Sequence, residues 1–318
     1  MLTVIVSVYN EELALREFYD AVVKVVSRTT ELIFVNDGST DRSREILKEF
    51  AEADERVRVI NFSRNFGHEA AMLAGIDHAC GDFMICMDAD LQHPVECIPK
   101  MEEKFKEGFD VVNMVRTRNR NAGVVKNITS NLFYSVINML SDTHMEKNAS
   151  DFFGISSRVA GILRNDYREK VRFIRGYVQN VGFNKTTIPY EAADRVAGNS
   201  KYNIRKLFRM SMNTIMCFSD APLKLGLYVG AAAVVLGIIM TVYTIVTWIV
   251  RGAPDGYATI IVLLCFMFGA LFIMVGIIGE YISVIFAEIK DRPIYIVEEQ
   301  YGFAGENDPG QCSQTKNM

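Results

Sequence analysis

The sequence predicts an α/β protein in which a Rossmann-like domain with a mostly parallel sheet precedes a two-helix transmembrane hairpin. Short apolar segments alternate with helical patterns through the first 115 residues, as in proteins with a parallel sheet. Residues 225–250 and 256–279 contain no charged side chain, and each stretch exceeds the roughly 20 apolar residues that cross a bilayer core. The 318 residues, half of them apolar and with a net charge of −4, suffice for one large domain or two small ones.

The expected elements of the first domain follow one another in a regular order. Apolar runs bounded by turn residues indicate strands, and apolar side chains gathered on one side indicate helices. We expect strands at 2–8, 31–35, 57–60, 83–87 and 110–115, and helices at 11–27, 40–50, 65–79 and 94–107. Residues 119–190 mix both patterns in an order that cannot be predicted. We also expect a short strand at 293–297 and a disordered tail at 303–318.

The two uncharged stretches predict transmembrane helices at about 223–250 and 257–282, joined by a tight turn. A pair of buried core helices is the alternative. The first eight residues lack the basic segment of a signal peptide and are typical of a strand. Basic residues flank the uncharged stretches: Lys201, Arg205, Lys206, Arg209 and Lys224 precede the first, and Lys290 and Arg292 follow the second, whereas the turn carries only Arg251. This asymmetry predicts that the first domain and both ends of the chain lie in the cytoplasm.

These patterns divide the chain into four parts. We expect the α/β domain at 1–200, an amphipathic juxtamembrane segment at 201–220, the two transmembrane helices within 221–287 and a cytoplasmic C-terminal segment at 288–318. The amphipathic segment has apolar side chains near one helical face and bases away from it, which is typical of a helix at a membrane surface. A soluble core helix is the alternative there.

Polar side chains follow three of the expected strands. They are Tyr9-Asn10-Glu11, Asn36-Asp37 and Asp88-Ala89-Asp90. The carboxyl ends of parallel strands meet at one edge of a sheet, where ligands of open α/β sheets bind. Two carboxylates at a strand end suit Mg²⁺ or Mn²⁺, whereas two solvated acids in a turn are the alternative. No Gly-x-Gly-x-x-Gly follows the first strand and no Walker loop is present, which argues against a dinucleotide cofactor.

Four motifs together resemble a known family. Val8-Tyr9-Asn10-Glu11, residues 35–39 (Val-Asn-Asp-Gly-Ser), 63–67 (Ser-Arg-Asn-Phe-Gly) and 88–92 (Asp-Ala-Asp-Leu-Gln) occur in this order. They resemble the family 2 glycosyltransferases with a GT-A fold, in particular the polyprenyl-phosphate sugar transferases such as dolichol-phosphate mannose synthases and bactoprenol glucosyltransferases. The resemblance extends from residue 1 to about residue 300 and includes the hairpin.

The resemblance implies roles for particular residues. Tyr9, Glu11 and Asp37 would hold the base and ribose of a nucleotide sugar, with Val8, Asn10 and Asp88 in the same nucleotide-binding set. Asp88 and Asp90, helped by Gln92, would hold Mg²⁺ or Mn²⁺ on the diphosphate. Asp151 would lie beside the acceptor, as a base or as a positioning group; a helix N-cap is the alternative. The sequence departs from the family pattern at His93, often Asp in relatives, and at Phe153, where relatives typically carry Arg.

Basic clusters without acids suggest where an anionic acceptor would bind. Residues 111–141 and 195–219 contain no acid but several bases. The resemblance implies that the second cluster belongs to a loop that closes over phosphates. The residues that we expect to bind a lipid phosphate are Arg116, Arg118, Lys126, Arg172, Arg195, Ser200 and Lys201. Arg175 is a further candidate, although for Arg172 and Arg175 a solvated surface position is an equal alternative.

The features together predict an enzyme of the bacterial inner membrane. We expect inverting, metal-dependent transfer of a hexose, glucose from UDP-glucose in the first instance, to undecaprenyl phosphate. The alternatives are another sugar (mannose, GlcNAc, galactose or an aminoarabinose-type sugar) and a non-catalytic membrane adaptor. A processive synthase is disfavoured because the sole tryptophan, Trp248, lies in a span rather than in a Gln-x-x-Arg-Trp motif. We expect a homo-oligomer and no nucleic-acid partner.

Overall fold

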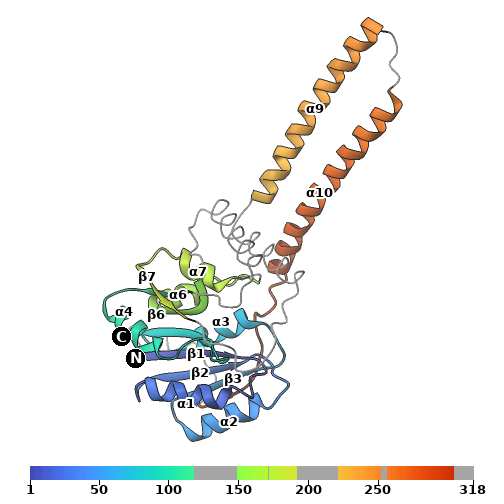
Figure 1. The fold of residues 1–318 in the computed structure, drawn as a ribbon. Helices are drawn as coiled ribbons and strands as arrows, with labels where there is room; N and C mark the ends of the chain where they lie inside the picture. Colours follow the sequence, from blue (N-terminus) through green and yellow to red (C-terminus); the bar gives the residue numbers. More distant parts are fainter. Residues whose placement is uncertain (118–148, 171, 192–220, 252–255, 304–318) are drawn as a thin grey trace. The chain divides into compact units, whose positions relative to one another are not determined.

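The computed structural model describes residues 1–117, 149–170, 172–191, 221–251 and 256–303. The chain forms two compact units (Figure 1). Met1–Phe208 and Pro293–Met318 make the first unit, and Arg209–Arg292 make the second. The expected juxtamembrane segment, the hairpin turn at 252–255 and the tail from residue 304 lie outside the described residues.

The first unit is built on an eight-stranded sheet with strand order β7-β5-β6-β4-β1-β2-β3-β8. Strands β4, β1, β2 and β3 are parallel, as expected, whereas β6 runs antiparallel to both of its neighbours and β8 antiparallel to β3. The strands are β1 (Leu2–Val8), β2 (Glu31–Asn36), β3 (Val57–Phe62), β4 (Phe83–Asp88), β5 (Val111–Arg116), β6 (Ala149–Ser156), β7 (Lys185–Tyr190) and β8 (Val297–Tyr301).

Helices cover both faces of this sheet, with α1 and α2 on one side and α3 on the other (Figure 1). The helices of the first unit are α1 (Leu15–Val25), α2 (Ser43–Ala53), α3 (His68–His78), α4 (Cys97–Lys106), α6 (Ser157–Asn165) and α7 (Ile174–Asn180). The four helices and five strands expected before residue 116 are all present, and their ends shift by at most four residues.

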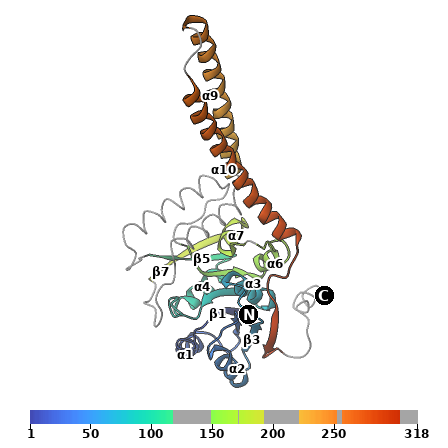
Figure 2. The same cartoon turned by 90° about the vertical axis from the view of Figure 1, so that its right-hand side faces the viewer.

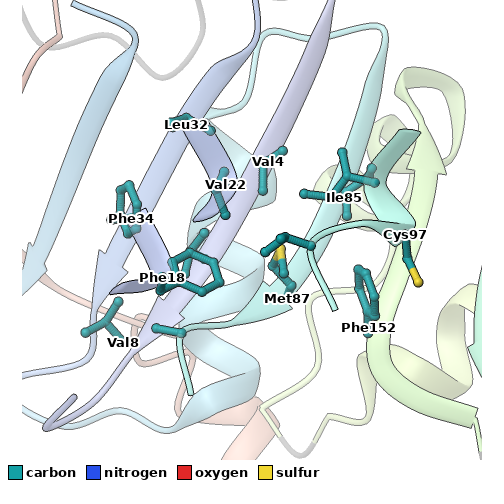
Figure 3. Close-up of a cluster of buried hydrophobic side chains, with 14 of the residues drawn as sticks. Val4, Val8, Phe18, Val22, Leu32, Phe34, Ile85, Met87, Cys97 and Phe152 are labelled. Atoms are coloured by element: carbon teal, nitrogen blue, oxygen red, sulfur yellow. The ribbon is translucent and has the colours of Figure 1, made fainter. Parts of the chain in front are cut away.

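The core explains why these segments pair. Figure 3 shows Phe18 and Val22 of α1 against Leu32 and Phe34 of β2, with the Phe18 and Phe34 rings edge to face at 6.3 Å. Alternate residues of β1, including Val4, contribute to the same cluster. Burial of such side chains is the main force that holds helices on a sheet. On the opposite face, a side chain at Gly75 would collide with Ile5, so the glycine lets α3 lie close to β1.

One expectation about this unit is wrong, and one alternative is excluded. The strand expected at 293–297 is β8 at Val297–Tyr301, which lies along the edge of β3 (Figure 2). Pairing with that edge determines its position, and Pro293, which has no N–H to donate, lies outside it. Asp151 is not a helix N-cap, because it lies within β6. Ser156 caps the next helix by accepting the Val159 N–H.

The second unit consists of two long helices, α9 (Ala221–Arg251) and α10 (Tyr257–Ile289). Tyr228–Val250 and Phe266–Ile289 are long and apolar enough to cross a membrane, and none of the residues in these windows is buried in the described protein. Core helices of a soluble domain would be covered, so that alternative is not supported. The helices pack on each other where Gly226 of α9 faces Met274 of α10.

Candidate active site

The three predicted strand-end clusters lie at one edge of the sheet. In the parallel register, Ser7 of β1 pairs with Asp88 of β4, and Val8 of β1 pairs with Asn36 of β2. The residues that follow these strands therefore meet at the carboxyl edge, as predicted.

The loops after β1 and β2 are tied together by hydrogen bonds. Asn10 has a left-handed backbone, with φ of 56°, and its Oδ1 accepts the Thr40 N–H at 2.8 Å. The Asn10 N–H donates to Ser39 Oγ at 3.0 Å. Val8 is buried, whereas 47% of Tyr9 is exposed at this rim. The Glu11 N–H donates to Ser43 Oγ at 3.0 Å, which fixes the backbone that presents these predicted nucleotide-binding residues.

Asp37 organises the loop that begins α3. The residue is only 3% exposed, and its carboxylate accepts the N–H groups of Phe66 at 2.6 Å and Gly67 at 3.0 Å. Burial raises the pKa of Asp37, and these two backbone donors oppose that rise. The next residue, Gly38, has φ of +65°, and a side chain there would collide with the backbone of Arg64. The close approach of the two loops therefore requires glycine.

A tight loop follows β4. Asp88 Oδ1 accepts the Ser7 hydroxyl at 2.7 Å, and the Asp88 N–H donates to His93 Nδ1 at 3.0 Å. Leu91 takes up a left-handed conformation, with φ of 60°, which costs about 1–2 kcal/mol for a residue with a side chain. Asp90 Oδ1 accepts the Gln92 N–H at 3.1 Å. The strained turn thus brings the candidate metal ligands Asp88, Asp90 and Gln92 together on one loop.

The donor set of this loop fits a hard divalent cation. Two carboxylates and an amide supply oxygen ligands, which Mg²⁺ and Mn²⁺ prefer. Two carboxylates and one amide leave room in the coordination shell of such a cation, so the loop suits an open site that substrate phosphates would complete.

His93 closes the loop from inside the protein. Its ring is 1% exposed and stacks on Phe152 at 5.0 Å. Burial lowers the pKa of His93, although Asp88 and Asp90 oppose this effect. Nδ1 accepts the Asp88 N–H. The His93 ring therefore supports the loop by bonding to the backbone of Asp88, and its Nδ1 lone pair is already used in this bond.

The other half of the site gathers around Asp151 on β6. Arg175 Nη1 of α7 lies 3.6 Å from Asp151 Oδ1, and 17% of the Arg175 side chain is exposed. The neighbouring Phe153, where relatives often carry Arg, is buried at 1% exposure. Arg175 therefore supplies a guanidinium beside Asp151 that position 153 does not.

Sequence reasoning missed two residues of the first turn of α3. Glu69 Oε2 accepts the Ile174 N–H at the start of α7, at 2.8 Å. Burial and the nearby Asp151 raise the pKa of Glu69 to about 7. His68 contacts both Asp88 and Asp151. Burial alone would lower the pKa of His68, but surrounding carboxylates, Asp88 first among them, raise it. The only sequence signal was their place directly after the 63–67 motif.

The predicted phosphate-binding residues are only partly described. Arg116 Nε donates to the Tyr190 hydroxyl at 2.9 Å, and its charge helps to lower the pKa of Asp88. Arg172 donates to the backbone carbonyls of Glu169 and Lys170, each at 3.2 Å. Arg118, Lys126, Arg195, Ser200 and Lys201 lie outside the described residues.

Comparison with known families identifies the class of protein. The profile described as "Glycosyl transferase family 2" matches residues 3–168, more than half of the chain. The chain therefore belongs to glycosyl transferase family 2, and it is a glycosyltransferase. A second profile, "GtrB C-terminal hairpin", matches residues 221–285.

Curated relatives match over nearly the whole length. The uncharacterized glycosyltransferase YkcC of Bacillus subtilis is 40% identical, covering 94% of this chain and 94% of that protein. The SfII prophage-derived bactoprenol glucosyl transferase of Shigella flexneri is 35% identical, covering 94% and 98%. A prophage bactoprenol glucosyl transferase homolog of Escherichia coli is also 35% identical, covering 93% and 98%. A solved glucosyl-3-phosphoglycerate synthase from Mycobacterium tuberculosis aligns with 68% of this chain and 76% of its own at 18% identity and a TM-score of 0.46.

Proposed function

We propose that this protein transfers a hexose from a nucleotide sugar to undecaprenyl phosphate, with glucose from UDP-glucose as the first candidate. The observation that carries this proposal is the end-to-end similarity, hairpin included, to proteins named bactoprenol glucosyl transferases. The fold supports it by bringing two sets of charged residues to one edge of the sheet, one around Asp88 and one around Asp151.

The donor half of the site comprises Tyr9, Asp37 and the 88–92 loop. A Mg²⁺ or Mn²⁺ ion held by Asp88, Asp90 and Gln92 would stabilise the charge that develops on the departing diphosphate. Tyr9 offers an exposed ring at the rim for the nucleobase. Asp37 and the ordered 65–67 loop would hold the ribose side.

The acceptor half comprises Asp151, Arg175 and Arg116. A lipid phosphate has a second pKa of about 6, so it is largely a dianion at neutral pH. Such an acceptor attacks the anomeric carbon without first losing a proton, in one displacement that inverts the configuration. Asp151 then orients the acceptor or a bound cation, and the two guanidiniums attract the phosphate.

The two apolar helices would place this chemistry at a membrane. A water-soluble donor and a lipid-anchored acceptor must meet at the bilayer surface. We propose that the catalytic unit and both ends of the chain face the cytoplasm of a bacterial inner membrane, and that the chain works as a homo-oligomer. The glycolipid product then forms in the inner leaflet.

The test is a transfer assay with the full-length protein in vesicles containing undecaprenyl phosphate. UDP-glucose, UDP-galactose, UDP-GlcNAc and GDP-mannose are supplied one at a time with Mg²⁺ or Mn²⁺, and the lipid product is identified by mass spectrometry. We expect a glucosyl lipid and no product after metal removal with EDTA. Transfer of another hexose would refute glucose alone, whereas absence of any lipid product with every donor and either metal would refute the proposed reaction.

A further inference from the structure

One side chain lies between the two halves of the proposed site. His68 is the first residue of α3, and its Nδ1 lies 2.9 Å from Ser7 Oγ and 3.4 Å from Asp88 Oδ1. On the other side of the ring, Nε2 lies 3.9 Å from Asp151 Oδ2. Asp88 belongs to the donor half and Asp151 to the acceptor half. A single imidazole therefore spans the region across which the sugar would move.

The Nδ1 side of the ring is already fixed. The Ser7 hydroxyl donates to Asp88 Oδ1 at 2.7 Å, so its oxygen is left to accept from His68 Nδ1–H. This short chain of hydrogen bonds holds the Asp88 carboxylate at a set distance from α3.

The Nε2 side is not yet engaged. Within the described residues, Nε2 is shielded from solvent and has no hydrogen-bond partner, although buried polar atoms are nearly always paired. Its separation of 3.9 Å from Asp151 exceeds a hydrogen bond. Catalytic hydrogen bonds are often long before substrate binds and shorten in the complex.

The backbone that carries His68 is held firmly. The two N–H groups just before it, those of Phe66 and Gly67, donate to the buried Asp37 carboxylate. Further along the helix, Gly75 lets α3 lie directly against Ile5 of β1. The His68 ring therefore projects from a rigid helix. A side chain that sets the distance between two other groups needs such a rigid support.

We propose that His68 is a positioning residue that sets the spacing between donor and acceptor. Nδ1–H of the protonated ring donates to Ser7, which holds Asp88, and Nε2–H donates to Asp151 when the acceptor is bound. Group transfer needs the reacting atoms about 3–3.5 Å apart, and a misplacement of about 1 Å can cost about 100-fold in rate. This inference rests on the proposed function, because it assigns the two carboxylates to donor and acceptor.

Two substitutions separate the two sides of the ring. In His68→Asn the amide nitrogen occupies the place of Nδ1, and in His68→Gln it occupies the place of Nε2. We expect H68N to keep the donor KM within about twofold while kcat falls about tenfold or more, because only the acceptor contact is lost. We expect H68Q to raise the donor KM about tenfold, because the link to Ser7 and Asp88 is lost.

His78, at the other end of α3, provides matched controls. Its Nδ1 lies 2.8 Å from the Ala74 carbonyl and its Nε2 3.2 Å from Gln300, so H78N and H78Q test loss of an imidazole on the same helix. Both should keep the donor KM and kcat. Ser7→Ala removes only the hydrogen bonds that join His68 to Asp88, so it should raise the donor KM as H68Q does. If a thermal unfolding assay shows that the His68 variants do not fold, S7A provides the test.

The inference is overturned if H68N and H68Q change the donor KM and kcat in the same proportion, if neither changes them, or if folded S7A keeps the wild-type donor KM. Each of these results presumes a wild-type protein that transfers sugar to the lipid phosphate. A wild type that transfers none would refute the proposed function instead.

Discussion

Glu69→Gln should make the protein more stable in alkaline solution. The Glu69 carboxylate packs against the first turn of α7, where it accepts the Ile174 N–H at 2.8 Å. Burial and Asp151 raise its pKa, and the Ile174 N–H, His68 and Arg175 only partly oppose this, so the pKa stands at about 7 against an ordinary 4.5. The folded protein therefore favours the protonated, uncharged form of Glu69.

The sign of the effect follows from proton linkage. A carboxyl whose pKa is raised by folding contributes its full stability below the unfolded pKa, and this contribution is lost as the pH rises through the folded pKa. The interval from 4.5 to about 7 corresponds to about 3 kcal/mol, at about 1.36 kcal/mol per pKa unit. Gln keeps an acceptor oxygen for the Ile174 N–H but never ionises, so the variant escapes this loss.

The assay compares thermal midpoints of wild type and E69Q at about pH 5 and about pH 8.5, followed by circular dichroism. Groups that do not interact with Glu69 titrate equally in both proteins, so the difference between them isolates Glu69 and the charged side chains beside it, Asp151 and His68. We expect near-equality at the lower pH and a higher midpoint for E69Q at the higher pH, by roughly 6–12 °C for a domain of this size. Glu49→Gln, which alters an exposed carboxylate paired with Arg16, should show no such change. An E69Q advantage that does not grow with pH would refute the reasoning.

Two further predictions concern the same edge of the sheet. Arg175→Gln should raise the KM for lipid phosphate about tenfold, since a charge-assisted contact is worth about 1.5–3 kcal/mol. Arg158→Gln is the control and should leave this KM unchanged, because the Arg158 guanidinium lies over Phe183. Equal KM values for the two variants would exclude Arg175 from acceptor binding. Gly38→Ala should destabilise the protein by at least about 2 kcal/mol, as left-handed strain of about 1–2 kcal/mol adds to a backbone collision. Gly182→Ala is the control, because Gly182 is also left-handed but has open space around it. If its thermal midpoint were as low as that of Gly38→Ala, the collision at Gly38 would not explain the loss of stability.

Local patterns were sufficient to predict that the polar residues after β1, β2 and β4 meet at one edge of the sheet. Apolar runs such as 83–87 end directly in their polar residues, and parallel pairing of β1, β2 and β4 then brings those residues together. No long-range information was needed beyond the strand–helix alternation. The placement of Asp88 and Asp90 on one loop followed from the same pattern, while their roles in metal binding stay a prediction.

The sequence offers Asp151, Arg116 and Arg175 as acceptor-side candidates, but it does not predict which of them lie together, because that depends on distant pairings. Asp151 lies on β6, whose antiparallel registers with β4 and β5 join segments that are far apart in the chain. Arg175 reaches Asp151 from α7, whose first residue, Ile174, donates its N–H to Glu69. His68 gave no signal of its own, since a histidine at a helix start is equally compatible with solvent.

Strand β8 is a further element whose position could not be predicted from its own residues. Its sequence, Val-Glu-Glu-Gln-Tyr, has little apolar content and does not predict a strand by composition. It forms one because β3 would otherwise expose an unpaired edge, and because Arg44 of α2 bonds to Glu298 and Glu299. Such a strand is determined by its partner rather than by its own residues.

Helix α3 is held by hydrogen bonds at both ends. This explains how the residues of the candidate site can keep fixed positions although the chain leaves the first unit to form the hairpin. At its start, Asp37 binds the backbone before His68. At its end, the Tyr295 hydroxyl donates to Asp77 at 2.7 Å, and Arg168 pairs with the same carboxylate at 2.8 Å. Tyr295 belongs to the segment that returns after α10. The return of the chain therefore braces the same helix that carries His68 and Glu69, at the end opposite to these two residues.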